Sequence, residues 1–136
     1  MLPSVVVLSA VLAWAALGTS AAFAEGDLAA GKKVFKRCLV CHTDVEGKHK
    51  TGPTLHKVLG RSAGTAKGFR YSTAYVRAGK EGLVWNDETL FEYLRHPKKF
   101  LRKFLKDPKV KSRMTMKYFK KKDRRNVIEY MKSLGD

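Results

Sequence analysis

Apolar positions recur at helical spacing in four stretches of the chain. In the first stretch they fall at intervals of three and four residues, at Leu28, Gly31, Val34, Phe35 and Cys38. This spacing predicts an amphipathic helix over residues 27–38 with Asp27 as its N-cap. A glycine inside a helix costs about 1 kcal/mol relative to alanine, so we expect Gly31 to let another helix approach closely.

Three further helical pieces are predicted in the C-terminal half. The first follows Asn86, a good N-cap with acidic residues behind it, and Pro97 ends it. A short amphipathic piece follows and stops at Asp107-Pro108; its apolar positions are Phe100, Leu101, Phe104 and Leu105. The last helix covers about residues 123–134, and its apolar face consists of Val127, Tyr130, Met131 and Leu134.

Residues 43–84 show no sustained periodicity and are rich in glycine, so we predict that this stretch is mostly loop. No segment is typical of a β-strand, and no internal repeat is visible. A loop of this length is unusual in a small domain unless it wraps a ligand that replaces the missing secondary-structure contacts. The pattern therefore predicts an all-α fold around a bound group.

Residues 1–24 contain no charged side chain, are apolar from Val5 to Leu17, and end in Ala22-Phe23-Ala24. This pattern is typical of an export signal cleaved after Ala24, which we expect here. The alternative is an uncleaved leader, since about 20 apolar residues can anchor a protein in a membrane. Cleavage leaves residues 25–136, enough for a single small domain with a modest apolar core.

The formal net charge of +16 belongs entirely to residues 25–136 and predicts attraction to acidic surfaces. An exported protein does not normally meet nucleic acid, so acidic protein surfaces or anionic lipid are the better partners. Fourteen of the 28 Lys and Arg residues lie between Lys98 and Arg125, against only two acidic residues. This segment therefore carries +12 of the net charge and is the expected docking surface.

Both cysteines of the chain lie in the stretch Cys38-Leu39-Val40-Cys41-His42. Two thiols at this spacing can add to the two vinyl groups of a haem, while the adjoining histidine binds its iron. A thioredoxin-type disulfide would need a strand before Cys38, and none is predicted. A zinc site would need further cysteines, or ligands drawn from His49, His56 and His96. The motif therefore favours covalent haem attachment.

With these features, the chain resembles the class I cytochromes c, especially the bacterial periplasmic carriers of photosynthetic and respiratory chains. The resemblance covers residues 26–134. Its specific segments are GKKVFKRCLVCHT (31–43), TGPTLHKVLGRSAG (51–64), GFRYSTA (68–74), ETLFEYLRHPKKFL (88–101), RMTMKY (113–118) and DRRNVIEYM (123–131). It implies the class I cytochrome c fold, with four or five helices and a long loop wrapped around one covalently bound haem c.

The resemblance also assigns roles near the attachment motif. Cys38 and Cys41 would form the thioethers, and His42 would be the proximal iron ligand. The carbonyl of Pro53 would accept the proton of the other imidazole nitrogen, which fixes the orientation of the ring.

Four more positions match residues of the haem pocket. Arg61, Tyr71 and Trp85 match positions that hold a buried haem propionate, and Tyr93 matches a tyrosine that contacts the distal sulfur. In the same comparison, Gly31 and Phe35 cross the last helix opposite Tyr130.

The sixth ligand is expected among the methionines that follow the leader. Met131 lies on the apolar stripe of the last helix, which favours a role in the core. The resemblance favours Met114 over Met116, because Met114 lies nine residues before Asp123 and Met116 replaces a usual Phe. Ser112 stands where Thr is usual, and Tyr75 stands where an Asn often positions a water. Residues 106–109 fall within an insertion relative to the shortest family members.

An iron bound by His42 and Met114 has no open coordination position, which implies electron transfer rather than catalysis. We expect a soluble, monomeric periplasmic carrier, with a cytochrome bc-type complex as donor and an oxidase or photosynthetic reaction centre as acceptor. The alternatives are a peroxidase-like haem enzyme and a gas-binding haem sensor, both of which need an open iron site. No distal histidine accompanies the Met114 segment, which disfavours the enzyme.

Overall fold

The computed structural model describes residues 25–135, so the predicted export signal lies outside the described residues. The elements in chain order are α1 (Leu28–Phe35), the short 3-10 helix η1 (Cys38–Val40), α2 (Thr73–Lys80), α3 (Asp87–Arg95), α4 (Pro97–Phe104) and α5 (Lys121–Lys132). Across residues 25–135 the only β-pairing is an isolated bridge between Ser62 and Val84. The predicted all-α fold is therefore confirmed. No described helix has the length and apolarity needed to cross a membrane.

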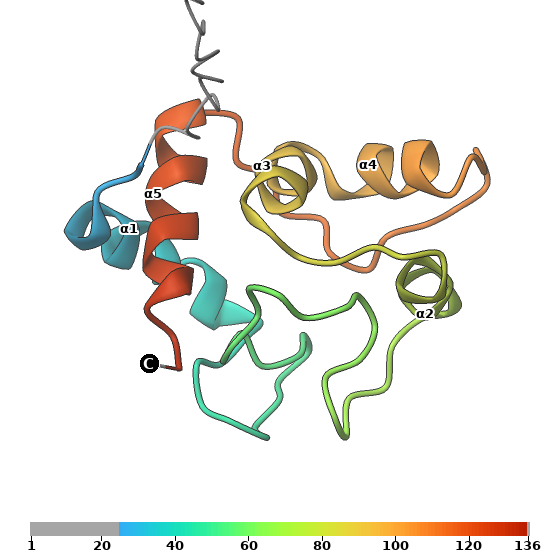
Figure 1. The fold of residues 1–136 in the computed structure, drawn as a ribbon, viewed down its shortest axis with the longest axis horizontal. Helices are drawn as coiled ribbons and strands as arrows, with labels where there is room; N and C mark the ends of the chain where they lie inside the picture. The colour runs from blue at the N-terminus through green and yellow to red at the C-terminus, as the bar shows by residue number, and fades with distance from the viewer. Residues whose placement is uncertain (1–24, 136) are drawn as a thin grey trace, which may run out of the picture.

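Helices α1 and α5 cross on one side of the molecule (Figure 1). Gly31 is buried at the crossing, where a Cβ atom would collide with the backbone carbonyl of Asn126 in α5. One turn later, Phe35 packs on Tyr130 with their ring centroids 5.0 Å apart. Gly31 is thus required by the close approach of the two helices, as its position in the sequence indicates. Asp27 caps α1 by accepting a hydrogen bond from the backbone N–H of Ala30 at 2.6 Å.

The junction between α3 and α4 differs in detail from the prediction. Asn86 forms the expected cap of α3, in a reciprocal pair of hydrogen bonds with Thr89. Pro97, predicted only to end that helix, is also the first residue of α4. Proline is well tolerated there because the first N–H of a helix has no partner within the helix. α4 consequently starts one turn before its first predicted apolar position.

Residues 43–84 are mostly loop, as predicted, but they also contain helix α2, which the pattern does not show. The helix has only eight residues and buries only Tyr75 and Ala78, which lie three positions apart, so its helical pattern is too short to recognise in the sequence. At its C-terminal end, a Cβ atom on Gly79 would collide with the carbonyl of Ala63. Packing against distant parts of the chain therefore stabilises α2, as it does most short helices. Helix α5 starts and ends two residues earlier than expected.

Candidate cofactor site

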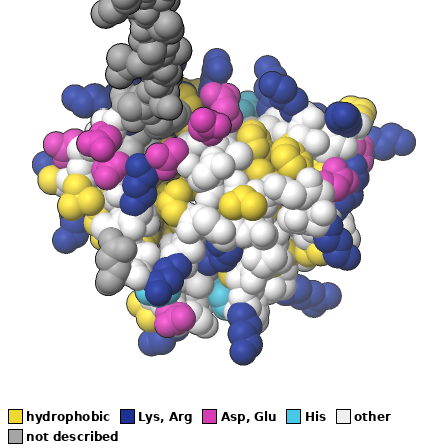
Figure 2. All heavy atoms as spheres, viewed as in Figure 1, with side chains coloured by type: hydrophobic (Ala, Val, Ile, Leu, Met, Phe, Trp, Pro, Cys, Tyr) yellow, Lys and Arg dark blue, Asp and Glu magenta, His cyan; other side chains and the backbone are white. Residues whose placement is uncertain are grey.

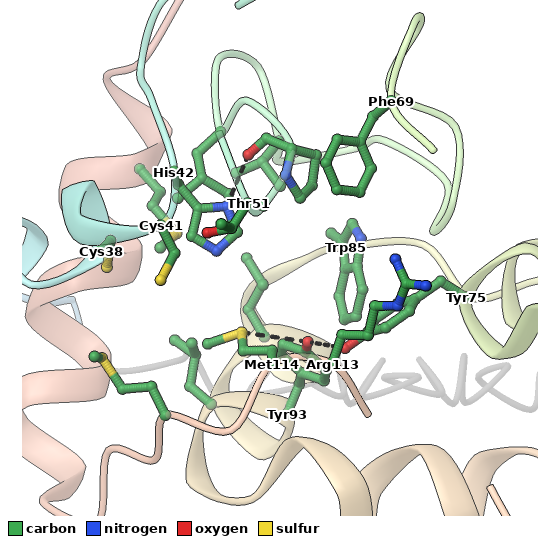
Figure 3. A pocket seen from close by; sticks show the side chains of 18 of the residues that line it. Cys38, Cys41, His42, Thr51, Phe69, Tyr75, Trp85, Tyr93, Arg113 and Met114 are labelled. Carbon is green, nitrogen blue, oxygen red and sulfur yellow. Dashed lines mark hydrogen bonds between the residues drawn. The ribbon is translucent and has the colours of Figure 1, made fainter. Parts of the chain in front are cut away.

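A largely apolar cavity lies between the segment from Arg37 to Tyr75 and the segment from Arg113 to Tyr118, with side chains of α3 at its base (Figure 3). Every site residue predicted from the sequence lines it: Cys38, Cys41, His42, Pro53, Arg61, Tyr71, Trp85, Tyr93 and Met114. Leu55, Val58, Leu90, Leu94 and Met131 add apolar surface. The structure therefore brings together residues that are up to 76 positions apart, from Cys38 to Met114.

The attachment motif forms one edge of this cavity, where Cys38 and Cys41 lie beside His42 (Figure 3). The turn is closed by the backbone N–H groups of Cys41 and His42, which both donate to the carbonyl of Cys38, at 3.1 and 2.9 Å. Cys38 is buried and Cys41 is exposed. Burial raises the pKa of the Cys38 thiol. Two thiols and an imidazole thus face one cavity from a single short turn.

His42 is held in one tautomer by its contact with Pro53. The His42 Nδ1 atom lies 2.7 Å from the Pro53 carbonyl, which can only accept, so Nδ1 carries the proton. Nε2 then has a free lone pair and can bind a metal ion. Burial is the main cause that lowers the pKa of His42, so the imidazole is neutral. A Cβ atom on Gly52 would overlap this ring, which explains the glycine at that position.

Met114 lies on the opposite wall of the cavity from His42 (Figure 3). Its sulfur accepts a hydrogen bond from the Tyr93 hydroxyl at 3.3 Å, and its carbonyl accepts one from Ser112 at 2.9 Å. The Tyr75 hydroxyl lies 2.7 Å from that of Tyr93 and 2.8 Å from that of Ser112. Burial, with the neighbouring Tyr75, raises the pKa of Tyr93 well above its usual value, so this phenol stays protonated. The hydroxyl groups of Tyr93 and Ser112 therefore contact Met114 directly, and that of Tyr75 contacts both of them.

Met116 also lines the cavity, and its sulfur is linked to the attachment edge through Tyr118. The Tyr118 hydroxyl donates to Met116 Sδ at 3.1 Å and lies 3.4 Å from Cys38 Sγ. The two methionine sulfurs are therefore held by different tyrosines, and only the sulfur of Met116 shares its tyrosine with a cysteine.

The polar end of the cavity contains a buried cation whose hydrogen bonds are incomplete. Arg61 donates from Nη1 to the His56 carbonyl at 3.1 Å and from Nη2 to the Thr54 carbonyl at 2.8 Å. Its Nε atom is buried without a partner, as is the hydroxyl oxygen of Ser72. Both residues line the cavity. A ligand with an anionic group at this end would satisfy both atoms.

These features match the parts of a haem. The apolar cavity suits the macrocycle, the paired thiols suit its vinyl edge, and the unpaired Arg61 and Ser72 atoms suit a propionate. The His42 Nε2 lone pair and the Met114 thioether on opposite walls suit a metal at the centre. The residues present therefore fit this group.

Two functional residues escaped the sequence analysis. Ser72 precedes a helix that the pattern does not show, so nothing distinguished it from other loop serines. Arg124 is only 2% exposed and donates to the carbonyls of Tyr118 and Phe119 at 2.6 and 2.8 Å, which ties the segment after Met114 to α5. Arg124 lies three residues before Val127, on the buried face of α5. A charged residue at a position where the helical period predicts an apolar one could have identified Arg124 from the sequence.

The other histidines do not line the cavity. His49 is half-buried and uses both ring nitrogens: Nδ1 accepts from the Thr54 N–H at 3.0 Å, and Nε2 lies 2.9 Å from the Lys67 carbonyl. His96 accepts from the Lys99 N–H at the start of α4. Between residues 25 and 135, no group of three or more His, Cys, Asp or Glu side chains could hold a metal ion.

Comparison with known proteins agrees with this geometry. The model of the cytochrome c family matches residues 28–135. The cytochrome c2 of Rhodospirillum rubrum is 43% identical over 125 residues, which cover 91% of this chain and 93% of the relative. The cytochrome c2 of Cereibacter sphaeroides is 39% identical over 137 residues, covering 94% and 93%. The solved structure of cytochrome c2 from Rhodospirillum centenum superposes with a TM-score of 0.77 at 39% identity, covering 82% of this chain and all of that one.

Proposed function

Because this chain belongs to the cytochrome c family and carries electrons with one covalently attached haem c, we propose that His42 and Met114 are its axial iron ligands. Cys38 and Cys41 form the thioethers. The observation that carries the proposal is the placement of a tautomer-fixed imidazole and a thioether on opposite walls of a cavity whose edge holds both thiols.

The choice of Met114 over Met116 rests on where each sulfur lies. Tyr93, at the base of the cavity, donates to Met114 Sδ, while the tyrosine that holds Met116 Sδ also contacts Cys38. A thioether next to the attachment edge is poorly placed to bind an atom at the centre of the macrocycle. Met114 lies across the cavity from His42, and the tyrosine that contacts its sulfur does not contact a cysteine.

The propionate end is assigned to Arg61, Tyr71 and Trp85, joined by Ser72. Arg61 Nε and Ser72 Oγ are buried donors without partners, and a carboxylate would accept from both. The Tyr71 hydroxyl accepts from the Ala66 N–H at 3.1 Å and keeps its own proton for a further acceptor. Burial is the main cause that lowers the pKa of Arg61, and a carboxylate beside it would offset that cost.

The haem supplies one-electron chemistry at its iron, and the protein supplies its surroundings. Pro53 holds His42 in one tautomer, and Met114 is held through Ser112 and Tyr93. With both axial positions filled by protein side chains, no substrate can bind at the metal, which favours outer-sphere electron transfer over catalysis. Apolar walls exclude water and limit the reorganisation that accompanies a change of charge.

The cellular setting follows from the leader and the charge. The export signal predicted for residues 1–24 directs the carrier to the periplasm, where a cytochrome bc-type complex donates the electron. An oxidase or a photosynthetic reaction centre accepts it. The strongly basic surface favours acidic docking sites on both partners.

An optical spectrum of the oxidised and reduced protein, recorded with and without carbon monoxide, tests this function. A carrier with His42 and Met114 ligation gives a low-spin ferric spectrum with a methionine-to-iron charge-transfer band, and binds little carbon monoxide when reduced. A high-spin ferric iron that binds carbon monoxide readily would instead support a peroxidase-like enzyme or a gas sensor.

A further inference from the structure

His96 is the single residue that joins two helices, α3 and α4. Its backbone N–H donates to the carbonyl of Tyr93 at 3.1 Å and ends α3, while its carbonyl accepts from the N–H of Phe100 at 3.0 Å and begins α4. Its ring turns onto the same helix start, where Nδ1 accepts a hydrogen bond from the Lys99 N–H at 3.3 Å. The N-cap of α4 is therefore a side chain that can change its charge near neutral pH.

The capping bond requires a neutral imidazole. A backbone N–H can only donate, so Nδ1 of His96 must present a lone pair to Lys99, and the proton of the neutral ring then lies on Nε2. When the ring gains a second proton, both nitrogens become donors, and Nδ1 faces the Lys99 N–H with no lone pair. The added positive charge also opposes the dipole at the helix start. Protonation therefore breaks the cap.

The ring of the capping histidine lies among cations from two parts of the chain. Lys98 and Lys99 are in the first turn of α4, whereas Lys117 is the residue before Tyr118. The Tyr118 N–H donates to the Leu94 carbonyl at 2.8 Å, which holds the end of that segment against α3. In the part of the chain that the structure describes, none of the three lysines forms an ion pair. Their charges are therefore not neutralised by a carboxylate.

The surroundings of His96 keep its ring neutral at neutral pH. Burial lowers the pKa of His96, and the charges of Lys117, Lys98 and Lys99 lower it further. Arg95, the last residue of α3, is the charged side chain next to it in the sequence and is also a cation. The imidazole therefore gains its second proton only in mildly acidic conditions, and it then adds a further positive charge beside the three lysines.

We propose that His96 is a positioning residue for docking, which caps α4 and fixes Lys98 and Lys99 at neutral pH, and which itself joins the positive docking surface in mild acid. The inference rests on the proposed function, in which the carrier meets acidic partners through its basic surface. A positive charge added beside three unpaired lysines strengthens attraction to an anionic partner and raises the rate of encounter. Electron transfer to such a partner should therefore become faster when His96 is protonated.

Small inorganic reagents whose charge does not depend on pH test this effect. The reactions are oxidation of the reduced holoprotein by anionic hexacyanoferrate(III) and reduction of the oxidised holoprotein by cationic hexaammineruthenium(II). At low salt, mild acid should speed the first reaction by roughly two-fold and slow the second. His96→Asn keeps the cap, because Asn is among the best N-cap residues, but it cannot titrate. Both changes of rate should be absent from this variant.

The ratio of the wild-type rate to the His96→Asn rate is the quantity to compare, since groups elsewhere titrate alike in both proteins. His56→Asn is the matched control, because it makes the same replacement in the loop between residues 43 and 60, which Figure 1 shows well apart from α4. It should retain the wild-type pH profile. A ratio that does not change with pH, or that changes in the same direction for both reagents, would overturn the proposal.

Nitrogen NMR of the reduced holoprotein tests the cap without electron transfer. At neutral pH the His96 Nδ1 resonance should be that of an unprotonated nitrogen, and the Lys99 amide resonance should shift when the ring is protonated. In His96→Asn this amide should not titrate. A proton on Nδ1 at neutral pH would overturn the cap and the proposal with it.

Salt dependence separates this inference from the proposed function. If the rates with hexacyanoferrate(III) do not fall as ionic strength rises, the basic surface does not steer anionic partners, and both proposals fail. If the rates fall with salt but the ratio of wild type to His96→Asn is constant with pH, only the role of His96 is overturned.

Discussion

The two walls of the cavity are built in different ways. The wall with His42 is local: its key contact joins residues 11 positions apart, from His42 to Pro53, and both thiols lie within four positions of the histidine. The wall with Met114 joins residues that are 21 positions apart at Tyr93 and Met114, and 37 apart at Tyr75 and Ser112. The first wall is therefore built from one short stretch of sequence, whereas the second forms only when distant segments pack together.

Because of this difference, different substitutions can displace His42 and Met114. The His42 turn is closed by backbone hydrogen bonds and one carbonyl, so it depends on few side chains outside its own segment. The Met114 wall depends on side chains from α2, α3, α4 and α5, including Arg102, which donates to the Val110 carbonyl at 2.9 Å. Damage to any of those elements can therefore move Met114, while His42 stays in place.

The largest effect of a substitution is expected in the wall with His42, when the thioether links to the haem are removed. Replacing both Cys38 and Cys41 by alanine should abolish covalent holoprotein, since no other thiol exists in the chain. Either single replacement should leave one thioether and a weakened attachment. Haem staining after denaturing electrophoresis measures the covalent yield. A normal yield from the double variant would contradict the attachment of haem through this motif.

The next largest effect is expected in the wall with Met114, where substitutions of Met114 and Met116 should have different results. Met114→Ala should remove the methionine-to-iron charge-transfer band and lower the midpoint potential, because a soft thioether ligand favours the reduced iron. Met116→Leu, which keeps a similar apolar volume near Cys38, should change both only slightly. Optical spectra and redox titration of both variants provide the comparison. If the two outcomes were exchanged, Met116 would be the ligand.

The same contrast explains what the sequence could predict. The cysteine motif, Asp27, Gly31 and Asn86 have roles set by short spacings, and the structure contains the expected contacts for the last three. α2 could not be predicted, because it is short and its close approach to Ala63 at Gly79 depends on the fold rather than on a local pattern. The resemblance to known families supplied Tyr93 and Met114, but not the direct contact of Tyr75 with both of its neighbours. That contact depends on how α2, α3 and the segment around Ser112 meet.

A smaller effect is expected from the cation that ties the distant wall to α5. Arg124→Met should destabilise the protein by about 2–4 kcal/mol, because it leaves the buried carbonyl of Tyr118 and the partly buried carbonyl of Phe119 without this donor. The adjacent Arg125→Met is the control and should cost less than about 1 kcal/mol. Denaturant unfolding gives both values. In Arg124→Met the charge-transfer band should also disappear at lower denaturant than the haem absorbance that reports His42; simultaneous loss of both would show that the two walls are not independent.

The smallest effects concern the surface beside the distant wall, which we call the basic cluster: Lys98, Lys99 and Lys117. Burial lowers the pKa of His96, and the charges of Lys117, Lys98 and Lys99 lower it further, so all three lysines act on this one imidazole. On the face drawn in Figure 2, several carboxylates gather on the side of α1, while basic side chains stand all around the edge.

If the basic cluster is the docking surface, neutralising Lys98, Lys99 or Lys117 with glutamine should slow second-order electron transfer to an acidic partner by roughly a few-fold at low salt. Lys132→Gln is the control, because Lys132 is already paired with Asp87 at 2.9 Å and with Glu129 at 3.1 Å and adds little to the external field. All differences should fade as salt approaches 0.1 M, where the Debye length falls to about 10 Å. Stopped-flow rates at several ionic strengths measure this. Equal effects at all four lysines, or rates that do not depend on salt, would show that the partner docks elsewhere.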